Sequence, residues 1–118
     1  MISAAIKVHK ALGPGLLESV YEECLFHELM LRELTVTRQY KLSLKYKDVN
    51  LDIGYRLDLL VDNKVVVELK VVDKLAAIHD AQLLTYMKLA NCSVGLLINF
   101  NVPVLKQGLR RKVLNYVG

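Results

Sequence analysis

Three polar residues within apolar segments have the types and spacing that phosphodiester hydrolysis requires. Asp58 lies in one apolar stretch, and Glu68 and Lys70 stand two residues apart in the next. Carboxylate oxygens bind Mg²⁺ or Mn²⁺, and such an ion polarises a phosphate and lowers the pKa of bound water. A neighbouring lysine can position that water and offset negative charge in the transition state. We therefore predict a metal-dependent hydrolytic site at these three residues.

The charged pair Glu68 and Lys70 lies on one face of a strand that is otherwise typical of a protein interior. Residues 65–72 alternate so that these two side chains share a face, and every other position is valine or leucine. Burying a charge is costly unless it is paired or binds a metal. The alternative is a solvent-facing ion pair on an edge strand, which contributes only about 0–1 kcal/mol. The valine-rich context is typical of a covered strand and favours the site.

The turn at residues 62–64 determines whether Asp58 can reach Glu68. An antiparallel hairpin with a three-residue loop places the two acids opposite each other, whereas a two-residue loop without a bulge puts them on opposite faces. A shared metal ion therefore requires the longer loop or a compensating bulge. Arg56 shares the face of Asp58, and we expect it either to pair with that acid or to contact phosphate.

Alternation and helical spacing predict one α/β domain over residues 1–118. A helix between two strands indicates a crossover connection, and we therefore expect a mixed β-sheet flanked by helices on both faces. The expected order is α-α-β-β-β-α-β-α. Helical spacing covers residues 2–12, 16–32, 75–89 and 105–116, and strand patterns cover 35–47, 51–61, 65–72 and 94–100.

The strand at residues 35–47 is expected to be half exposed, with a basic face and an apolar face. The basic residues of this strand and of the C-terminal helix are consistent with solvated surfaces first and with a nucleic-acid track second. The basic set is Arg38, Lys41, Lys45, Lys47, Lys106, Arg110, Arg111 and Lys112. The apolar face of the strand carries Val36, Tyr40, Leu42, Leu44 and Tyr46.

The composition excludes a disordered tail and sets weak limits on partners. Apolar residues make up 53% and charged residues 24%, which is typical of a packed globular protein. A net charge of +4 is compatible with a nucleic-acid partner without proving one. Cys24 and Cys92 lie far apart with no Cys/His cluster, so we expect reduced thiols and no zinc site. No signal peptide or membrane span is expected, and we predict a cytoplasmic protein.

The arrangement of these motifs resembles a known superfamily. An aspartate, a Glu-x-Lys on the next strand and a helix that carries a glutamine are similar to the PD-(D/E)XK nuclease-like superfamily. Residues 15–21, which run from Gly15 through Glu18 to Tyr21, resemble the signature of the bacterial GxxExxY proteins, a branch of that superfamily. Residues 54–60, 67–70 and 79–86 resemble its other blocks. Leu57 replaces the proline that often precedes the aspartate.

The resemblance implies a restriction-endonuclease-like fold and a role for each residue on the strands. Asp58 and Glu68 would be metal ligands together with the backbone carbonyl of Leu69. Lys70 would be the catalytic lysine. The implied cofactor is Mg²⁺ or Mn²⁺, and the implied partner is nucleic acid.

Two helical residues, Glu18 and Gln82, are implied to act from outside the strands. Glu18 would be a further ligand or a water-orienting acid, although its position is also consistent with a first-turn glutamate favoured by the helix dipole. Gln82 would support the site, and with His79 and Tyr86 it forms a polar stripe on its helix. That stripe is consistent with a hydrogen-bonded support or with a DNA-facing edge. His9, on an apolar face, is expected to be a hydrogen-bonded core residue.

These observations lead to one functional prediction and two alternatives. The prediction is a Mg²⁺- or Mn²⁺-dependent nuclease, a hydrolase that cleaves DNA. The first alternative is a catalytically inactive module of the same fold that binds nucleic acid or another protein. The second is a different metal-dependent phosphodiesterase, including one that processes RNA. A homodimer could supply further substrate-binding surface, but no sequence feature determines the oligomeric state.

Overall fold

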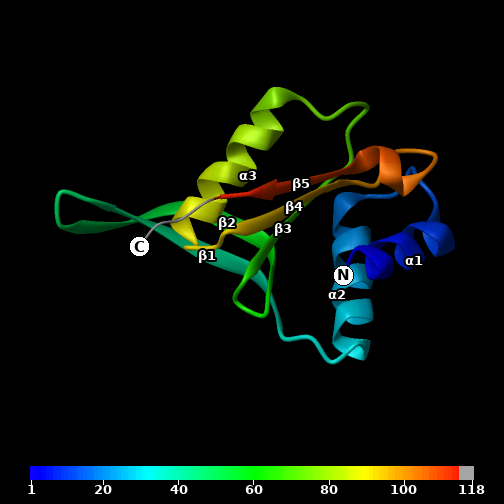
Figure 1. Cartoon of the computed structure of the whole chain (residues 1–118), viewed down its shortest axis with the longest axis horizontal. Helices are drawn as coiled ribbons and strands as arrows, with labels where there is room; N and C mark the ends of the chain where they lie inside the picture. Colours follow the sequence, from blue (N-terminus) through cyan, green and yellow to red (C-terminus); the bar gives the residue numbers. More distant parts are fainter. Residues whose placement is uncertain (115–118) are drawn as a thin grey trace.

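The computed structural model describes residues 1–114, apart from the side chain of Ile53, as two helices followed by a sheet into which a third helix is inserted (Figure 1). The first seven predicted elements are present, and their ends shift by no more than two residues. None of the helices in this part of the chain is long and apolar enough to cross a membrane. The helices are α1 (Ile2–Leu12), α2 (Glu18–Leu31), α3 (Ala77–Leu89) and the 3-10 helix η1 (Leu105–Gly108). The strands are β1 (Val36–Tyr46), β2 (Val49–Val61), β3 (Val65–Lys70), β4 (Val94–Asn99) and β5 (Leu109–Val113).

The five strands form one mixed sheet in the order β1-β2-β3-β4-β5. β3 and β4 run parallel and are connected through α3, whereas the other neighbouring pairs are antiparallel. Figure 1 shows α3 on one face of the sheet and α1 and α2 on the other. This arrangement confirms the expected mixed α/β sheet with helices on both faces.

Two apolar cores cover the opposite faces of the sheet, and β3 belongs to both. The α1–α2 core includes Tyr21, Leu25, Leu59, Val67 and Leu69. The α3 core includes Leu57, Leu60, Val66, Leu83 and Met87. Because β3 is the central strand and Glu68 on it is only 5% exposed, the alternative of a solvent-facing ion pair on an edge strand is wrong.

His9 and the two cysteines have the predicted character. His9 is buried, and its Nε2 lies 2.8 Å from the Val102 carbonyl oxygen, to which it donates. This contact confirms His9 as a hydrogen-bonded core residue. Cys24 and Cys92 form no disulfide, as expected.

In β1 and β2, the alternation of side chains between the two faces of the sheet breaks at Gln39 and at the residue opposite it. In β1, Val36 packs in the α1–α2 core and Leu42 in the α3 core, although their even spacing would place both on one face. In β2, Leu57 and Leu59 likewise pack on opposite faces. Gln39 has a φ of 50°, which is uncommon for a residue with a Cβ atom. The prediction that the apolar residues of 35–47 share one face is therefore wrong across this break.

The C-terminal segment is a strand and not the predicted helix. Residues 105–116 form η1 and β5 as far as they are described, and Tyr116 lies outside the described residues. β5 pairs with β4 and satisfies backbone groups that would otherwise form an open sheet edge. Gly108, between η1 and β5, lies so close to β4 that an added Cβ would be 2.2 Å from the Asn99 carbonyl oxygen. The observed order therefore ends in a strand.

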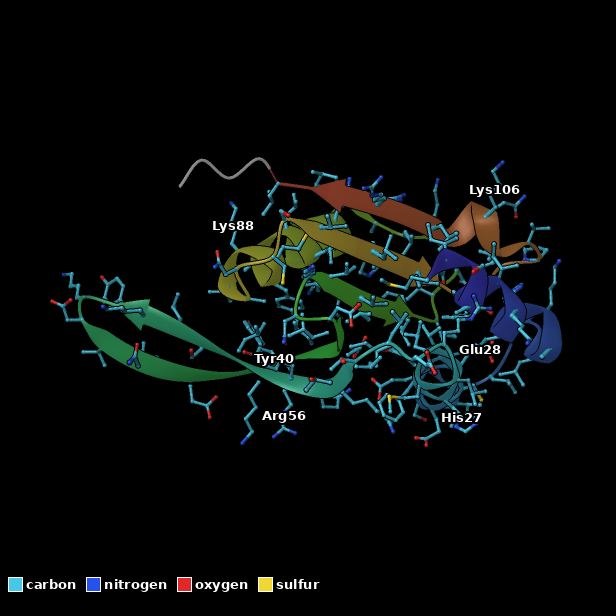
Figure 2. All side chains as sticks on the ribbon, turned by 60° about the horizontal axis from the view of Figure 1, so that its bottom comes forward. His27, Glu28, Tyr40, Arg56, Lys88 and Lys106 are labelled. Atoms are coloured by element: carbon cyan, nitrogen blue, oxygen red, sulfur yellow. The ribbon has the colours of Figure 1, made fainter. Side chains whose placement is uncertain are left out.

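Beyond a register shift between Lys41 and Ser43, β1 and β2 continue as a two-stranded hairpin arm, which we define as residues 43–54. Figures 1 and 2 show this arm projecting away from the helices. Its Tyr46 and Val49 side chains are exposed. The part of the sheet that can position a buried site is therefore the other end of these strands, between α2 and α3.

Candidate active site

The β2–β3 ladder ends where the two predicted carboxylates meet. Val61 pairs with Val65 across a three-residue turn, which confirms the register that places Asp58 opposite Glu68. Regular pairing stops one residue before these acids. There the Asp58 N–H donates to Glu68 Oε1 (3.1 Å), and the Leu69 N–H donates to Asp58 Oδ2 (2.8 Å). Carboxylate oxygens thus accept backbone hydrogen bonds, and the two acids are held next to each other.

The Leu69 peptide group faces the same carboxylates. In an extended strand, the N–H and C=O of one residue point toward the same neighbouring strand. Because the Leu69 N–H donates to Asp58, the Leu69 carbonyl oxygen is also directed toward β2. Its side chain is fully buried in the α1–α2 core, which holds this peptide in place.

Burial raises the pKa of both acids. Burial is the first cause that raises the pKa of Glu68 to about 9, and the Asp58 charge is the second. The pKa of Asp58 is also raised, first by burial, although the hydrogen bond from Leu69 acts in the opposite direction. Both groups would be stabilised in their ionised form by an added cation.

Lys70 ends β3, and the side chain of Asn99 holds the chain that follows. The Lys70 carbonyl accepts a hydrogen bond from the Phe100 N–H (3.0 Å). The Asn99 side chain, 1% exposed, accepts from the Val72 N–H (3.1 Å) and donates to the Val72 carbonyl (2.8 Å). The half-buried Lys70 lies close enough to the three predicted acids for its charge to lower the pKa of each, against the effect of burial. The sequence prediction missed Asn99, because an asparagine at a strand end is typical of many ordinary loops.

A buried tyrosine fixes the loop that presents Glu18 at the rim of the site. The Tyr21 hydroxyl donates to the Gly13 carbonyl and accepts from the Leu16 N–H (3.2 Å). Glu18 begins α2 and is exposed on its outer side. Its pKa is raised, first by partial burial on its inner side and then by the charge of Asp58. Glu18 therefore lies within electrostatic reach of the carboxylate pair.

A fourth acid, Glu22, lies one helical turn after Glu18, and the sequence prediction missed it. Glu22 is 7% exposed, and it accepts hydrogen bonds from Arg38 (2.9 Å) and Gln39 (2.6 Å). Its charge contributes to the raised pKa of Asp58. The spacing of four residues on one helix is the signal that could have identified it. These contacts brace the break in β1 against α2, so that Arg38 is engaged in ion pairs and does not lie on a solvated face.

The polar stripe on α3 divides into two parts. Gln82 and Tyr86 line a groove together with Tyr55 from β2. His79 Nδ1 accepts a hydrogen bond from the Ala76 N–H (2.9 Å) and so caps the start of the helix. The structure thus places Gln82 and Tyr86 beside the sheet and gives His79 a structural contact.

The predicted basic residues also divide into paired and exposed side chains. Arg110 donates to the Asp80 carboxylate of α3, and Lys112 Nζ lies 3.3 Å from Asp80 Oδ1. These two basic residues tie β5 to α3. Arg56 and Lys106 are exposed, and Figure 2 shows both side chains directed into solvent. Arg56 is therefore available for phosphate, whereas Arg110 and Lys112 have an acidic partner.

The donor atoms at Asp58 and Glu68 suit a hard divalent cation. Each carboxylate keeps a second oxygen that the two backbone donors do not use, and the Leu69 carbonyl is directed to the same side. Oxygen donors of this kind are the ligands that Mg²⁺ and Mn²⁺ prefer. Within residues 1–114, no three acidic, histidine or cysteine side chains lie together at metal-binding spacing. The ligand set that fits is therefore two carboxylates and one carbonyl, with Glu18 farther away.

A mixed sheet with an aspartate and a Glu-x-Lys pair at the point where its central strands separate defines the PD-(D/E)XK class of proteins. A family model described as the PD-(D/E)XK nuclease superfamily matches residues 1–112, and this chain therefore belongs to that superfamily. The observed sheet is consistent with the restriction-endonuclease-like fold expected for it. Searches of curated proteins and of solved structures gave no significant match.

Proposed function

We propose that this protein is a Mg²⁺- or Mn²⁺-dependent nuclease that hydrolyses phosphodiester bonds of DNA. The observation that carries the proposal is the buried pair Asp58 and Glu68, in which each carboxylate is held by a backbone donor and both have a raised pKa. When both acids are ionised, Lys70 can balance only one of their two negative charges. Membership of a nuclease superfamily supports a divalent cation as the missing positive charge.

Each residue has a distinct role in the proposed reaction. Asp58, Glu68 and the Leu69 carbonyl would hold the cation. When bound, the cation supplies Lewis-acid polarisation of the phosphate and a lower pKa of water. Lys70 offsets the negative charge that develops on the phosphate oxygens and positions the attacking water. Glu18, at the rim, would hydrogen-bond that water, and Gln82 would support the site from α3.

We also assign the chain to the GxxExxY branch of the superfamily. The motif from Gly15 to Tyr21 has a physical basis in this structure, because the Tyr21 hydroxyl binds both sides of the loop that precedes α2. Glu18 begins that helix within electrostatic reach of Asp58. In this assignment the tyrosine of the motif holds the loop in place, and the loop in turn positions the glutamate near Asp58.

The decisive test is cleavage of DNA by the purified chain with Mn²⁺ or Mg²⁺, on single-stranded, duplex, nicked and flapped substrates. We expect cleavage that Lys70→Ala lowers by about 100-fold to 1,000-fold, the range seen when one group that stabilises transition-state charge is removed. Lys112→Ala is the matched control, because Lys112 pairs with Asp80 away from the carboxylate pair. Absence of cleavage on all substrates, or equal cleavage by wild type and Lys70→Ala, would contradict the proposal.

One observation favours the inactive binding module as the second candidate. No third ligand side chain joins Asp58 and Glu68 among the described residues, so the cation site has only two side-chain ligands. Calorimetric titration with Mn²⁺ separates the two candidates. If Asp58→Asn and Glu68→Gln leave Mn²⁺ affinity unchanged while DNA still binds, the protein is a binding module and not a nuclease.

A further inference from the structure

A groove lies on the face of the sheet covered by α3, and of its wall residues only Gln82 has a role in the proposed hydrolysis. It has a volume of about 290 Å³, which is close to the lower limit of about 300 Å³ for small-molecule pockets. We call it the α3 groove. Its walls are Tyr55, Ile78, Ala81, Gln82, Thr85 and Tyr86.

Tyr55 of the α3 groove is three residues before Asp58 in β2, which brings the groove near the carboxylate pair. The pKa of Tyr86 is raised, first by burial and then by the charge of Glu68, with smaller contributions from Tyr55 and Asp58. Tyr86 is therefore within electrostatic reach of both acids. A larger hollow of about 480 Å³ lies between α1 and α2, but none of the predicted site residues lines it.

The side chains of the α3 groove suit a planar, polar-edged ring. The rings of Tyr55 and Tyr86 are 5.8 Å apart and inclined at 50°, so they do not stack face to face on each other. Tyr55 is 51% exposed and has a ring surface available to a ligand. Gln82 and Thr85 supply an amide and a hydroxyl, which can donate and accept hydrogen bonds. The residues known to line the groove are uncharged, so it does not suit a phosphate.

We propose that the α3 groove binds an unstacked nucleobase beside the phosphate to be cleaved, and that the substrate is therefore single-stranded or locally opened DNA. This inference rests on the proposed nuclease function. Bases within a duplex are stacked on their neighbours and cannot present a face to Tyr55. Aromatic side chains bind bases of single strands by stacking, largely without regard to sequence.

The test measures binding of a short single-stranded oligodeoxynucleotide and of its duplex, by fluorescence anisotropy in chelator without divalent cations. The single strand is expected to bind at least about 10-fold more tightly than the duplex. Tyr55→Leu should weaken single-strand binding by about 10-fold to 100-fold, the size of one lost base–aromatic stack, and Tyr55→Phe should retain it. Tyr46→Leu is the matched control, because Tyr46 is a tyrosine of similar exposure on the hairpin arm, 58% against 51% for Tyr55.

A second readout locates the base. A 5-iododeoxyuridine in the single strand should crosslink on irradiation to Tyr55 or Tyr86, as mapped by mass spectrometry. Equal binding of strand and duplex, unchanged binding by Tyr55→Leu, or crosslinks only on the hairpin arm would overturn the base site. Cleavage that depends on Lys70 would then leave the nuclease proposal intact. Conversely, if single-strand binding depends on Tyr55 but no cleavage occurs, the nuclease proposal is overturned and the base site is supported.

Discussion

Two clusters form around buried or half-buried acids, one between α3 and β5 and one between β2 and β3, and they differ in how their charge is balanced. Asp80 on α3 has two basic partners from β5, Arg110 and Lys112. Asp58 and Glu68 have each other as nearest acids. Lys70 is the basic residue that acts on them from within this part of the chain. In the first cluster, basic side chains of the protein balance the charge of the acid. In the second, a bound cation would be needed to balance the charge of both acids when they are ionised.

The balance of charge distinguishes a structural ion pair from a site that needs a ligand. A structural pair joins two elements, here α3 and β5, and gains little by adding an ion. In an acid pair with a raised pKa, burial of the charge and then the like charge of the neighbour oppose folding, and a cation that binds there stabilises the fold. The two clusters should therefore respond differently to changes in pH, in metal concentration and in their own residues.

The largest expected effect is a loss of stability as pH rises in the absence of divalent cations. The pKa of Glu68 is about 9 in the folded chain against an ordinary 4.5, so the folded state keeps a proton that the unfolded chain releases. This contribution to stability is fully present below about pH 4.5 and is lost as pH rises through about 9. Urea unfolding across that range should show a decline on the order of several kcal/mol.

Two variants identify the source of that decline. Glu68→Gln cannot ionise, and it should flatten the dependence of unfolding free energy on pH. Asp80→Asn, in the balanced cluster, should leave the slope as it is in the wild type. A Glu68→Gln protein that loses stability with pH as steeply as the wild type would show that the carboxylate pair is not responsible.

The second effect is stabilisation by a divalent cation near pH 8. Saturating Mn²⁺, at about 100 times its dissociation constant, should raise the free energy of unfolding by about 2.7 kcal/mol, because it binds only the folded carboxylate pair. Chelator should reverse the change. Asp58→Asn should abolish it and Asp80→Asn should preserve it, as measured by thermal unfolding with and without the ion. Equal stabilisation of both variants would mean that Mn²⁺ binds elsewhere.

The smallest effect belongs to the balanced cluster. Asp80→Asn should lower the free energy of unfolding by about 1 kcal/mol, because its partners Arg110 and Lys112 are 38% and 34% exposed and water screens the pair. Chemical denaturation measures the change. DNA cleavage per folded molecule should stay within about twofold of the wild type. A loss of cleavage as large as that expected for Lys70→Ala would place Asp80 in the reaction.

Local spacing was sufficient to predict most of the fold and the position of the acid pair. Strand alternation and the three-residue turn at 62–64 predicted that Asp58 stands opposite Glu68, and the observed pairing confirms that register. Periodicity predicted the three α-helices and the first four strands to within two residues at each end, although the apolar face of β1 changes sides at Gln39. The roles of Glu18, Lys70 and Gln82 in catalysis stay predictions.

Most of the errors and omissions depend on contacts between distant segments. Residues 109–113 are a strand because β4 has an open edge there, which no local pattern reveals. Asn99 and Glu22 act on segments 27 and 17 residues away, respectively. The sequence alone thus determined which residues could share a site, because side-chain period is a local property of the backbone. Tertiary structure alone decided which charges are balanced and which rings meet, because these depend on packing between segments that spacing does not relate.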